Sequence, residues 1–200
     1  MENLPIYKIV VNEEDDQTGV DFISLVDEPA TEFNWMAFKN HKINFKADQD
    51  KKMIYGVFIA ADKPIYRNDN GFEYYTVFDK DTIFKIVKKF NKNNYNRNIN
   101  FQHMDKMVQG YVVENFITSD KVKADFGYEV PEGSWFGSVY IEDENFWESY
   151  IKKGELKGFS VEILSGLENA DNEYKIEKLK AILKSNKGKH QKIKELKDLF

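Results

Sequence analysis

The chain of 200 residues has no cysteine, only four prolines and no long apolar run. Without cysteine, neither disulfides nor thiolate metal ligands can hold the fold, and a cysteine nucleophile is excluded. The N-terminus, MENLPIYKIVVNEEDD, has no basic segment followed by an apolar one, and no later run approaches the roughly 18 apolar residues of a membrane span. We therefore expect a soluble, cytoplasmic protein with no membrane partner.

Several motifs that carry cofactor and metal chemistry are also missing. The sequence has no P-loop, no dinucleotide-binding glycine fingerprint, no EF-hand and no HExxH motif. Its three histidines, His41, His103 and His190, have no second histidine at metal-ligand spacing. The consecutive acids at 142–144 adjoin a predicted helix start, where caps and solvated charges are common. We expect no metal and no cofactor.

The apolar segments that are present have the character of strands. They are short, rich in β-branched and aromatic residues, and bounded by Asn, Asp, Gly or Pro. The predicted strands are 6–11, 53–60, 73–78, 99–102, 111–117, 122–128, 134–141 and 158–164. A β-dominated core follows from this pattern.

Helical periodicity occurs twice within this β-rich region. The first predicted helix starts near Asp81 as the cap and places Ile83, Phe84, Val87 and Phe90 on one face. The second begins after an N-cap at Asp143, has an apolar stripe of Phe146, Trp147, Tyr150 and Ile151, and ends at Gly154. The strand 158–164 then follows almost at once.

The composition favours one domain with an appendage. With 42% hydrophobic and 15% aromatic residues, the chain can bury one core, which we assign to residues 1–168, with 29–52 as a loop or linker. Residues 169–200 are predicted to form a basic amphipathic helical tail. Residues 175–200 hold nine lysines and three acids, about +6, which leaves about −11 elsewhere. Because these lysines alternate with Leu and Ile and lack an aromatic stacking platform, we do not expect nucleic acid as a partner.

Two residues are candidates for chemistry. Ser160 interrupts the apolar strand 158–164, so its hydroxyl is either bonded within the core or available as a nucleophile, which needs a base. His103 follows the strand 99–102, where a fold can expose a side chain while anchoring its backbone. The GxSxG pattern of α/β-hydrolases is not met, because Glu162 stands where the second glycine should be. From these residues alone, structural and catalytic roles both remain open.

Three segments together resemble the prohead (capsid maturation) proteases of tailed phages, in particular the XkdF-like branch. They are INFQHMDKMVQGYVVENFI around His103, VPEGSWFGSVYIEDENFWESYIKKGELKGFSVE running into Ser160, and VDFISLVDEPA near the N-terminus. The resemblance covers residues 18–165 and implies an α+β fold, a closed β-barrel flanked by helices and similar to the herpesvirus assembly protease. It also implies a serine endopeptidase with Ser160 as nucleophile and His103 as general base.

The third catalytic residue is less clear from the resemblance. In many prohead proteases a segment of the form acidic-x-Ser-Leu-Val-x-x-Pro-Ala follows the nucleophile, whereas the similar VDFISLVDEPA lies at 20–30, before both candidates. This order resembles a circular permutation, with one barrel strand supplied from the N-terminal end. Asp21 is then the candidate that orients His103. Because the alignment is offset by about one residue, Glu114 and Asp105 stay open as alternatives.

The resemblance also implies substrates and a place of action. Scaffold and major capsid proteins, and the protease itself, would be cleaved inside assembling proheads in the host cytoplasm, and a homo-oligomer is expected. The alternative is a catalytically inactive capsid-assembly or scaffolding protein with the same fold. An inactive protein would have no chemical need for both His103 and Ser160.

Overall fold

The computed structural model describes residues 4–15, 17–29, 46–119 and 130–170, and, nearer the C-terminus, 176, 179–180, 182–185, 188 and 191–193. Within these residues, no helix is long and apolar enough to cross a membrane. The predicted strand 122–128 and His41 and His190 lie outside the described residues.

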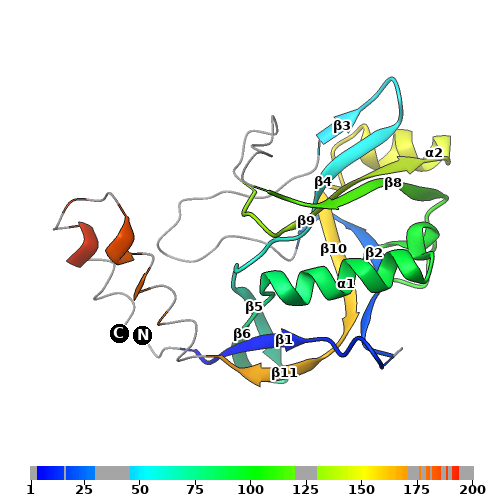
Figure 1. The fold of residues 1–200 in the computed structure, drawn as a ribbon. Helices are drawn as coiled ribbons and strands as arrows, with labels where there is room; N and C mark the ends of the chain where they lie inside the picture. Colours follow the sequence, from blue (N-terminus) through cyan, green and yellow to red (C-terminus); the bar gives the residue numbers. More distant parts are fainter. Residues whose placement is uncertain are drawn as a thin grey trace.

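The strands form three sheets, and Figure 1 shows the helix α1 (Lys80–Lys92) lying across them. The first has the order β11 (Gly166–Asn169), β1 (Ile6–Val10), β6 (Phe72–Val77), β5 (Ile65–Asp69). The second has the order β10 (Gly158–Leu164), β2 (Gly19–Val26), β7 (Ile99–Phe101). The third has the order β3 (Lys46–Asp48), β4 (Met53–Ile59), β9 (Trp135–Ile141), β8 (Gly110–Ile117). The α+β class is confirmed.

The closed barrel that the resemblance implies is not seen in the described residues, because no strand ladder joins the three sheets. Side chains fill the space between them instead. Phe58 on β4 meets Phe159 on β10 edge to face, with ring centroids 4.8 Å apart, and Trp135 on β9 at 5.0 Å. Trp135 in turn contacts Phe90 at 4.9 Å. Aromatic packing therefore binds the sheet of β10 to the sheet of β4 where backbone hydrogen bonds do not.

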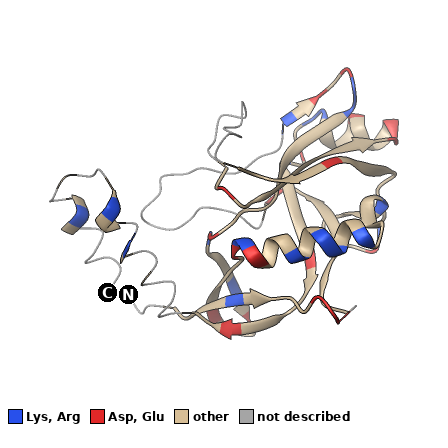
Figure 2. Cartoon of the chain, viewed as in Figure 1, with Lys and Arg blue, Asp and Glu red and all other residues tan. Residues whose placement is uncertain are grey.

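The main helix, α1 (Lys80–Lys92), confirms the first predicted helix, with two corrections. Its N-cap is Asp79 and not Asp81, because the Asp79 carboxylate accepts a hydrogen bond from the Thr82 amide at 2.7 Å. Phe84 does not lie on the buried face: it is 57% exposed, whereas Ile83, Ile86 and Phe90 are buried. Figure 2 shows acidic residues at the start of α1 and lysines along it, the order that the helix dipole favours.

Short helices precede two strands of the second sheet, β7, which leads to His103, and β10, which carries Ser160. The 3-10 helix η1 (Tyr95–Arg97) leads into β7. Asp143 caps α2 (Glu144–Phe146), as predicted, by accepting from the Phe146 amide at 3.0 Å. The chain continues as a π-helical turn, η2 (Trp147–Ile151), and turns at Gly154 with φ +71°. Trp147 and Ile151 are buried, so this turn fixes the start of β10 against the core.

The second sheet brings both ends of the described domain together. β2 lies between β10, which it pairs antiparallel, and β7, which it pairs parallel. The N-terminal segment VDFISLV therefore supplies the strand beside Ser160, as the permuted order predicts. Val20, Leu25 and Val26 are buried and Phe22 is half-buried.

The predicted linker and tail boundaries are only partly described. Residues 46–48 form β3 and pair with β4, so the loop prediction for 29–52 is wrong at that end, and 30–45 lie outside the described residues. β11 crosses the predicted boundary at residue 168, because it pairs with β1 and is followed by the buried Ala170. The separate tail stays a prediction.

Candidate active site

Ser160 lies in the middle of β10, and its position follows from the alternation of side chains along that strand. Ser160 pairs directly with Ser24 on β2, and Ser24 pairs with Asn100 on β7. Side chains of directly paired residues point to the same face of a sheet, and so do residues two apart on one strand. Ser160, Ser24, Asn100 and Glu162 therefore share one face, which we call the polar face of the sheet.

The opposite face of the same three strands is apolar. Ile23 and Leu25 on β2 and Ile99 on β7 are completely buried, and Phe159 beside Ser160 is almost so. These side chains belong to the core. The core thus fixes the backbone of every strand that carries a polar-face residue.

His103 reaches the polar face because of an unusual turn. Gln102 and His103, which directly follow β7, both have left-handed backbone conformations, with φ of +55° and +54°. Such conformations are uncommon for residues other than glycine and cost free energy. The turn is held by hydrogen bonds from the Gln102 amide to Leu25 O at 3.1 Å and from the Met104 amide to Phe101 O at 2.9 Å. It directs the imidazole back over β2.

The imidazole of His103 is anchored through its Nδ1 atom. Nδ1 lies 2.9 Å from Ser24 Oγ and 3.3 Å from Glu162 Oε1. Asn100 joins the two partners: its Oδ1 accepts from the Ser24 hydroxyl at 2.6 Å, and its Nδ2 donates to Glu162 Oε1. The His103 side chain itself is 42% exposed.

These contacts determine the histidine tautomer. The Glu162 carboxylate can only accept, so the Asn100 amide group turns its Nδ2 to it and its Oδ1 to Ser24. Ser24 Oγ lies 2.6 Å from Asn100 Oδ1 and 3.4 Å from Glu162 Oε1, so we assign its single hydrogen to the nearer acceptor, Asn100. The Ser24 oxygen then accepts from Nδ1–H of His103. Nδ1 then holds the proton of the neutral ring. Nε2 keeps its lone pair, which is the state that a general base requires.

Sequence reasoning did not find Glu162, Asn100 or Ser24 as site residues. In the sequence, Glu162 stands out only as a departure from GxSxG. The period of two along a strand nevertheless places it on the same face as Ser160. Asn100 and Ser24 are polar residues inside strands whose neighbours are apolar, and both are almost completely buried. In the sequence, a polar residue inside an apolar strand segment is the signal that could have identified both residues, because such a side chain is buried and needs a hydrogen-bond partner.

The structure does not bring Asp21 to His103. β2 and β10 change register beside Glu162, and Asp21 is the residue of β2 without a partner on β10. Its side chain is exposed. The two alternative acids do not contact His103 either. Glu114 accepts a hydrogen bond of 3.3 Å from the hydroxyl of Ser138 on β9, and Asp105 is exposed in the turn after β7. In the described part of the chain, the carboxylate that contacts His103 is Glu162.

Ser160 and Ser24 differ in their hydrogen bonding. Ser24 is completely buried and its hydroxyl is fully engaged with Asn100 and His103. Ser160 retains some exposure, and none of the described residues forms a hydrogen bond with its hydroxyl. The Ser160 hydroxyl is therefore the one that remains available for chemistry on this face. The described residues contain no group of three or more His, Cys, Asp or Glu side chains that could hold a metal ion.

Comparison with known proteins identified one matching family. No curated protein and no solved structure matches the chain. Residues 40–168 match the family described as "Putative phage serine protease XkdF", and the match includes Ser160, His103 and Glu162 but not the strand β2. The match spans more than half of the chain and agrees with the resemblance seen in the sequence. The chain belongs to the XkdF family of phage serine proteases.

Proposed function

We propose that this protein is an active serine endopeptidase that cleaves scaffold and major capsid proteins, and itself, during maturation of the phage prohead. Ser160 is the nucleophile, His103 the general base, and Glu162 the carboxylate that orients the base. The observation that carries the proposal is the anchoring of His103 through Nδ1, which leaves Nε2 unprotonated on the face that Ser160 shares.

The reaction follows from these positions. Ser160 Oγ attacks the carbonyl carbon of the scissile peptide bond while His103 Nε2 takes its proton. The imidazolium that forms is stabilised by the nearby Glu162 carboxylate. Collapse of the tetrahedral intermediate breaks the C–N bond, and the proton on Nε2 passes to the leaving amine. Water, deprotonated in the same way, then hydrolyses the ester of Ser160.

Glu162 takes the role that the sequence suggested for Asp21. It is held by Asn100, so its position does not depend on solvent, and it also accepts from His103. Asn100 and Ser24 position the base without touching substrate. Asn100 and Ser24 are thus positioning residues, and the three side chains together restrict the imidazole to one orientation.

The substrates and location rest on the family. A phage protease of this type acts in the host cytoplasm, and we extend this to the interior of assembling proheads, with a homo-oligomeric enzyme and no role for nucleic acid. The test is co-expression of the full chain with the scaffold and major capsid proteins of its phage. We expect new N-termini in both proteins, mapped by mass spectrometry, for the wild type and none for Ser160→Ala.

The alternative function is an inactive assembly protein that keeps the fold. It is prompted by the lack of a Ser160–His103 hydrogen bond, although such bonds often form only when substrate binds. Absence of processing by the folded wild type would support this alternative. Processing that is lost in Ser24→Ala but retained in Ser160→Ala would instead move the nucleophile to Ser24.

A further inference from the structure

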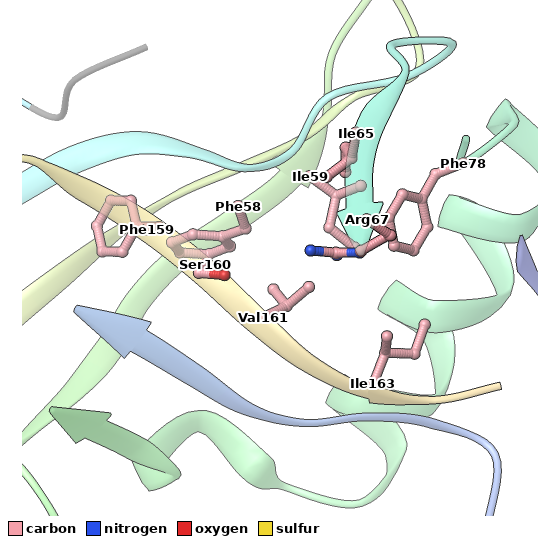
Figure 3. Close-up of a pocket in the computed structure, with 9 residues that line it drawn as sticks. All are labelled: Phe58, Ile59, Ile65, Arg67, Phe78, Phe159, Ser160, Val161 and Ile163. Atoms are coloured by element: carbon pink, nitrogen blue, oxygen red, sulfur yellow. The ribbon is translucent and has the colours of Figure 1, made fainter. Parts of the chain in front are cut away.

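A pocket opens next to Ser160, along the edge of β10 that does not pair with β2. Figure 3 shows β2 on one side of β10 and the residues of β4 and β5 on the other. Ser160 lines the pocket together with Phe58 and Ile59 from β4, Ile65 and Arg67 from β5, Phe78, and the apolar residues of β10. The cavity volume, counted as the space that the centre of a water-sized sphere can occupy, is about 20 Å³. This volume suits a small group and not an aromatic ring.

Among the described residues, Arg67 is the one charged residue that lines this pocket. Its guanidinium end extends toward β10 and Ser160, and the remaining walls are mostly aliphatic and aromatic. Burial lowers the pKa of the Arg67 guanidinium, although the neighbouring Tyr74 and Asp69 act in the opposite direction. The group stays charged, because an arginine is not deprotonated in a protein.

Arg67 has no anionic partner among the described residues. Asp69, whose charge acts on Arg67 from two residues along β5, accepts a hydrogen bond from the Tyr74 hydroxyl and forms no ion pair with Arg67. No described carboxylate forms an ion pair with Arg67, whereas the exposed Arg97 pairs with Glu142 at 3.3 Å. A half-buried cation without a counter-ion loses hydration without recovering it. A ligand that carries a negative charge would supply the missing counter-ion.

We propose that this pocket is a substrate subsite in which Arg67 binds the carboxylate of an Asp or Glu side chain close to the scissile bond. A carboxylate fits the size of the pocket and pairs with the two-pronged guanidinium through two hydrogen bonds. The proposal rests on the proposed function, because it makes Ser160 the neighbouring nucleophile. It adds the substrate class, which is peptide segments with an acidic residue at one fixed position.

The geometry favours a side-chain subsite over an oxyanion site. Donors to an oxyanion must lie about 3 Å from the oxygen of the attacked carbonyl, and hence beside Ser160 Oγ. Arg67 makes no hydrogen bond to Ser160, and the pocket it occupies extends past Ser160 to Val161 and Ile163. Apolar walls that continue beyond the nucleophile accommodate the methylene groups of a side chain.

A cleavage experiment tests the subsite directly. The full chain is incubated with a synthetic combinatorial peptide library, and the cut positions are mapped by mass spectrometry. We expect Asp or Glu at one position relative to the cut for the wild type and for the matched control Arg97→Gln. For Arg67→Gln, kcat/KM on the acidic peptides should fall about 10- to 100-fold, while their amide (Gln or Asn) counterparts change little. Arg67→Lys should be intermediate, and Arg67→Glu should favour Lys or Arg at that position.

A binding experiment separates this proposal from the proposed function. The same library is passed over immobilised Ser160→Ala and over the double variant Ser160→Ala, Arg67→Gln, so that no chemistry is needed. Arg67-dependent retention of acidic peptides without any Ser160-dependent cleavage would support the subsite and overturn the protease. Cleavage with no acidic preference, or with a preference that survives Arg67→Gln, would overturn the subsite alone. If Arg67→Gln lowered kcat equally on every peptide, Arg67 would stabilise the oxyanion and not bind a substrate side chain. If the protein neither cleaved nor retained any peptide, both proposals would be overturned.

Discussion

The two faces of the sheet formed by β10, β2 and β7 are built from residues adjacent in the chain, but one face packs in the core and the other carries the polar groups of the candidate site. Ile23 and Ser24 are adjacent in the chain and both are completely buried. Ile23 contributes to the core, whereas Ser24 holds the histidine through hydrogen bonds. Core packing on one face therefore supplies the rigid backbone, and the other face can use its polar groups for function. Substitutions on the polar face should change activity, and those on the apolar face should change stability.

The largest effect is expected from Ser160→Ala. Loss of the nucleophile should lower kcat by about 10⁴-fold or more in a protease assay on the mapped peptide. Because none of the described residues bonds to this hydroxyl, the midpoint of urea unfolding should stay close to that of the wild type. An active Ser160→Ala variant, or one that no longer folds, would break the distinction between the two faces.

Glu162→Gln is expected to have the next largest effect. The amide keeps the size of the side chain but removes the charge that stabilises the imidazolium, so kcat should fall about 10²- to 10⁴-fold. The matched control is Asp21→Asn, which removes an acid from the neighbouring strand where it is exposed, and its kcat should be unchanged. The reverse result, with Asp21→Asn impaired and Glu162→Gln active, would restore the assignment made from the resemblance.

Ile23→Ala tests the apolar face. Removing most of this buried side chain should reduce the free energy of unfolding by about 2–5 kcal/mol, measured by urea denaturation. The kcat of the fraction that remains folded should be close to that of the wild type, because the polar groups are untouched. A large loss of kcat in fully folded Ile23→Ala would show that the two faces are not independent.

Ser24→Ala should give the smallest effect, and on both quantities. His103 loses one acceptor for Nδ1–H but keeps Glu162, so kcat should fall by about tenfold. The side-chain oxygen Oδ1 of Asn100 loses the hydrogen bond from Ser24, which should lower the free energy of unfolding by about 1–3 kcal/mol. Ser24→Thr, which retains a hydroxyl at the same place, should recover part of the activity and serves as the control.

The sequence predicted most of the central strands because their apolar patterns are strong, but it missed three strands at the periphery. β5 (IYRND), β11 (GLEN) and β3 (KAD) are short and largely polar, and their pairing partners define them more than their own residues do. Their positions depend on long-range contacts that no local pattern encodes. β5 matters most, since it carries Arg67.

The candidate site was predicted to a similar degree. Ser160 and His103 stood out from their positions in or next to strands and took their roles from the resemblance. VDFISLVDEPA at 20–30 was expected to supply a strand, and β2 in this segment pairs with the strand of Ser160. Asp21 was chosen from the acidic position of the resembling motif, but it lies three residues from Ser24, so the period of two along β2 does not place it on the polar face, and it has no partner on β10. Glu162 replaces it near His103 because it is two residues from Ser160 and can extend across β2. The left-handed turn that brings His103 over β2 is not readable from the sequence, and it decides that the histidine meets Glu162.

The chain order of the second sheet has a consequence for synthesis. Ser24 and Glu162 contact the same histidine but are 138 positions apart. A ribosome adding about 5–20 residues per second needs about 7–28 s to make that interval. During this time β2 is already synthesised, but its antiparallel partner β10 does not yet exist. Ser160, the proposed nucleophile, is also on the last strand of this sheet to be synthesised, so the proposed site is incomplete in the nascent chain. Under the proposed function, the order of the strands therefore prevents cleavage until β10 has been translated.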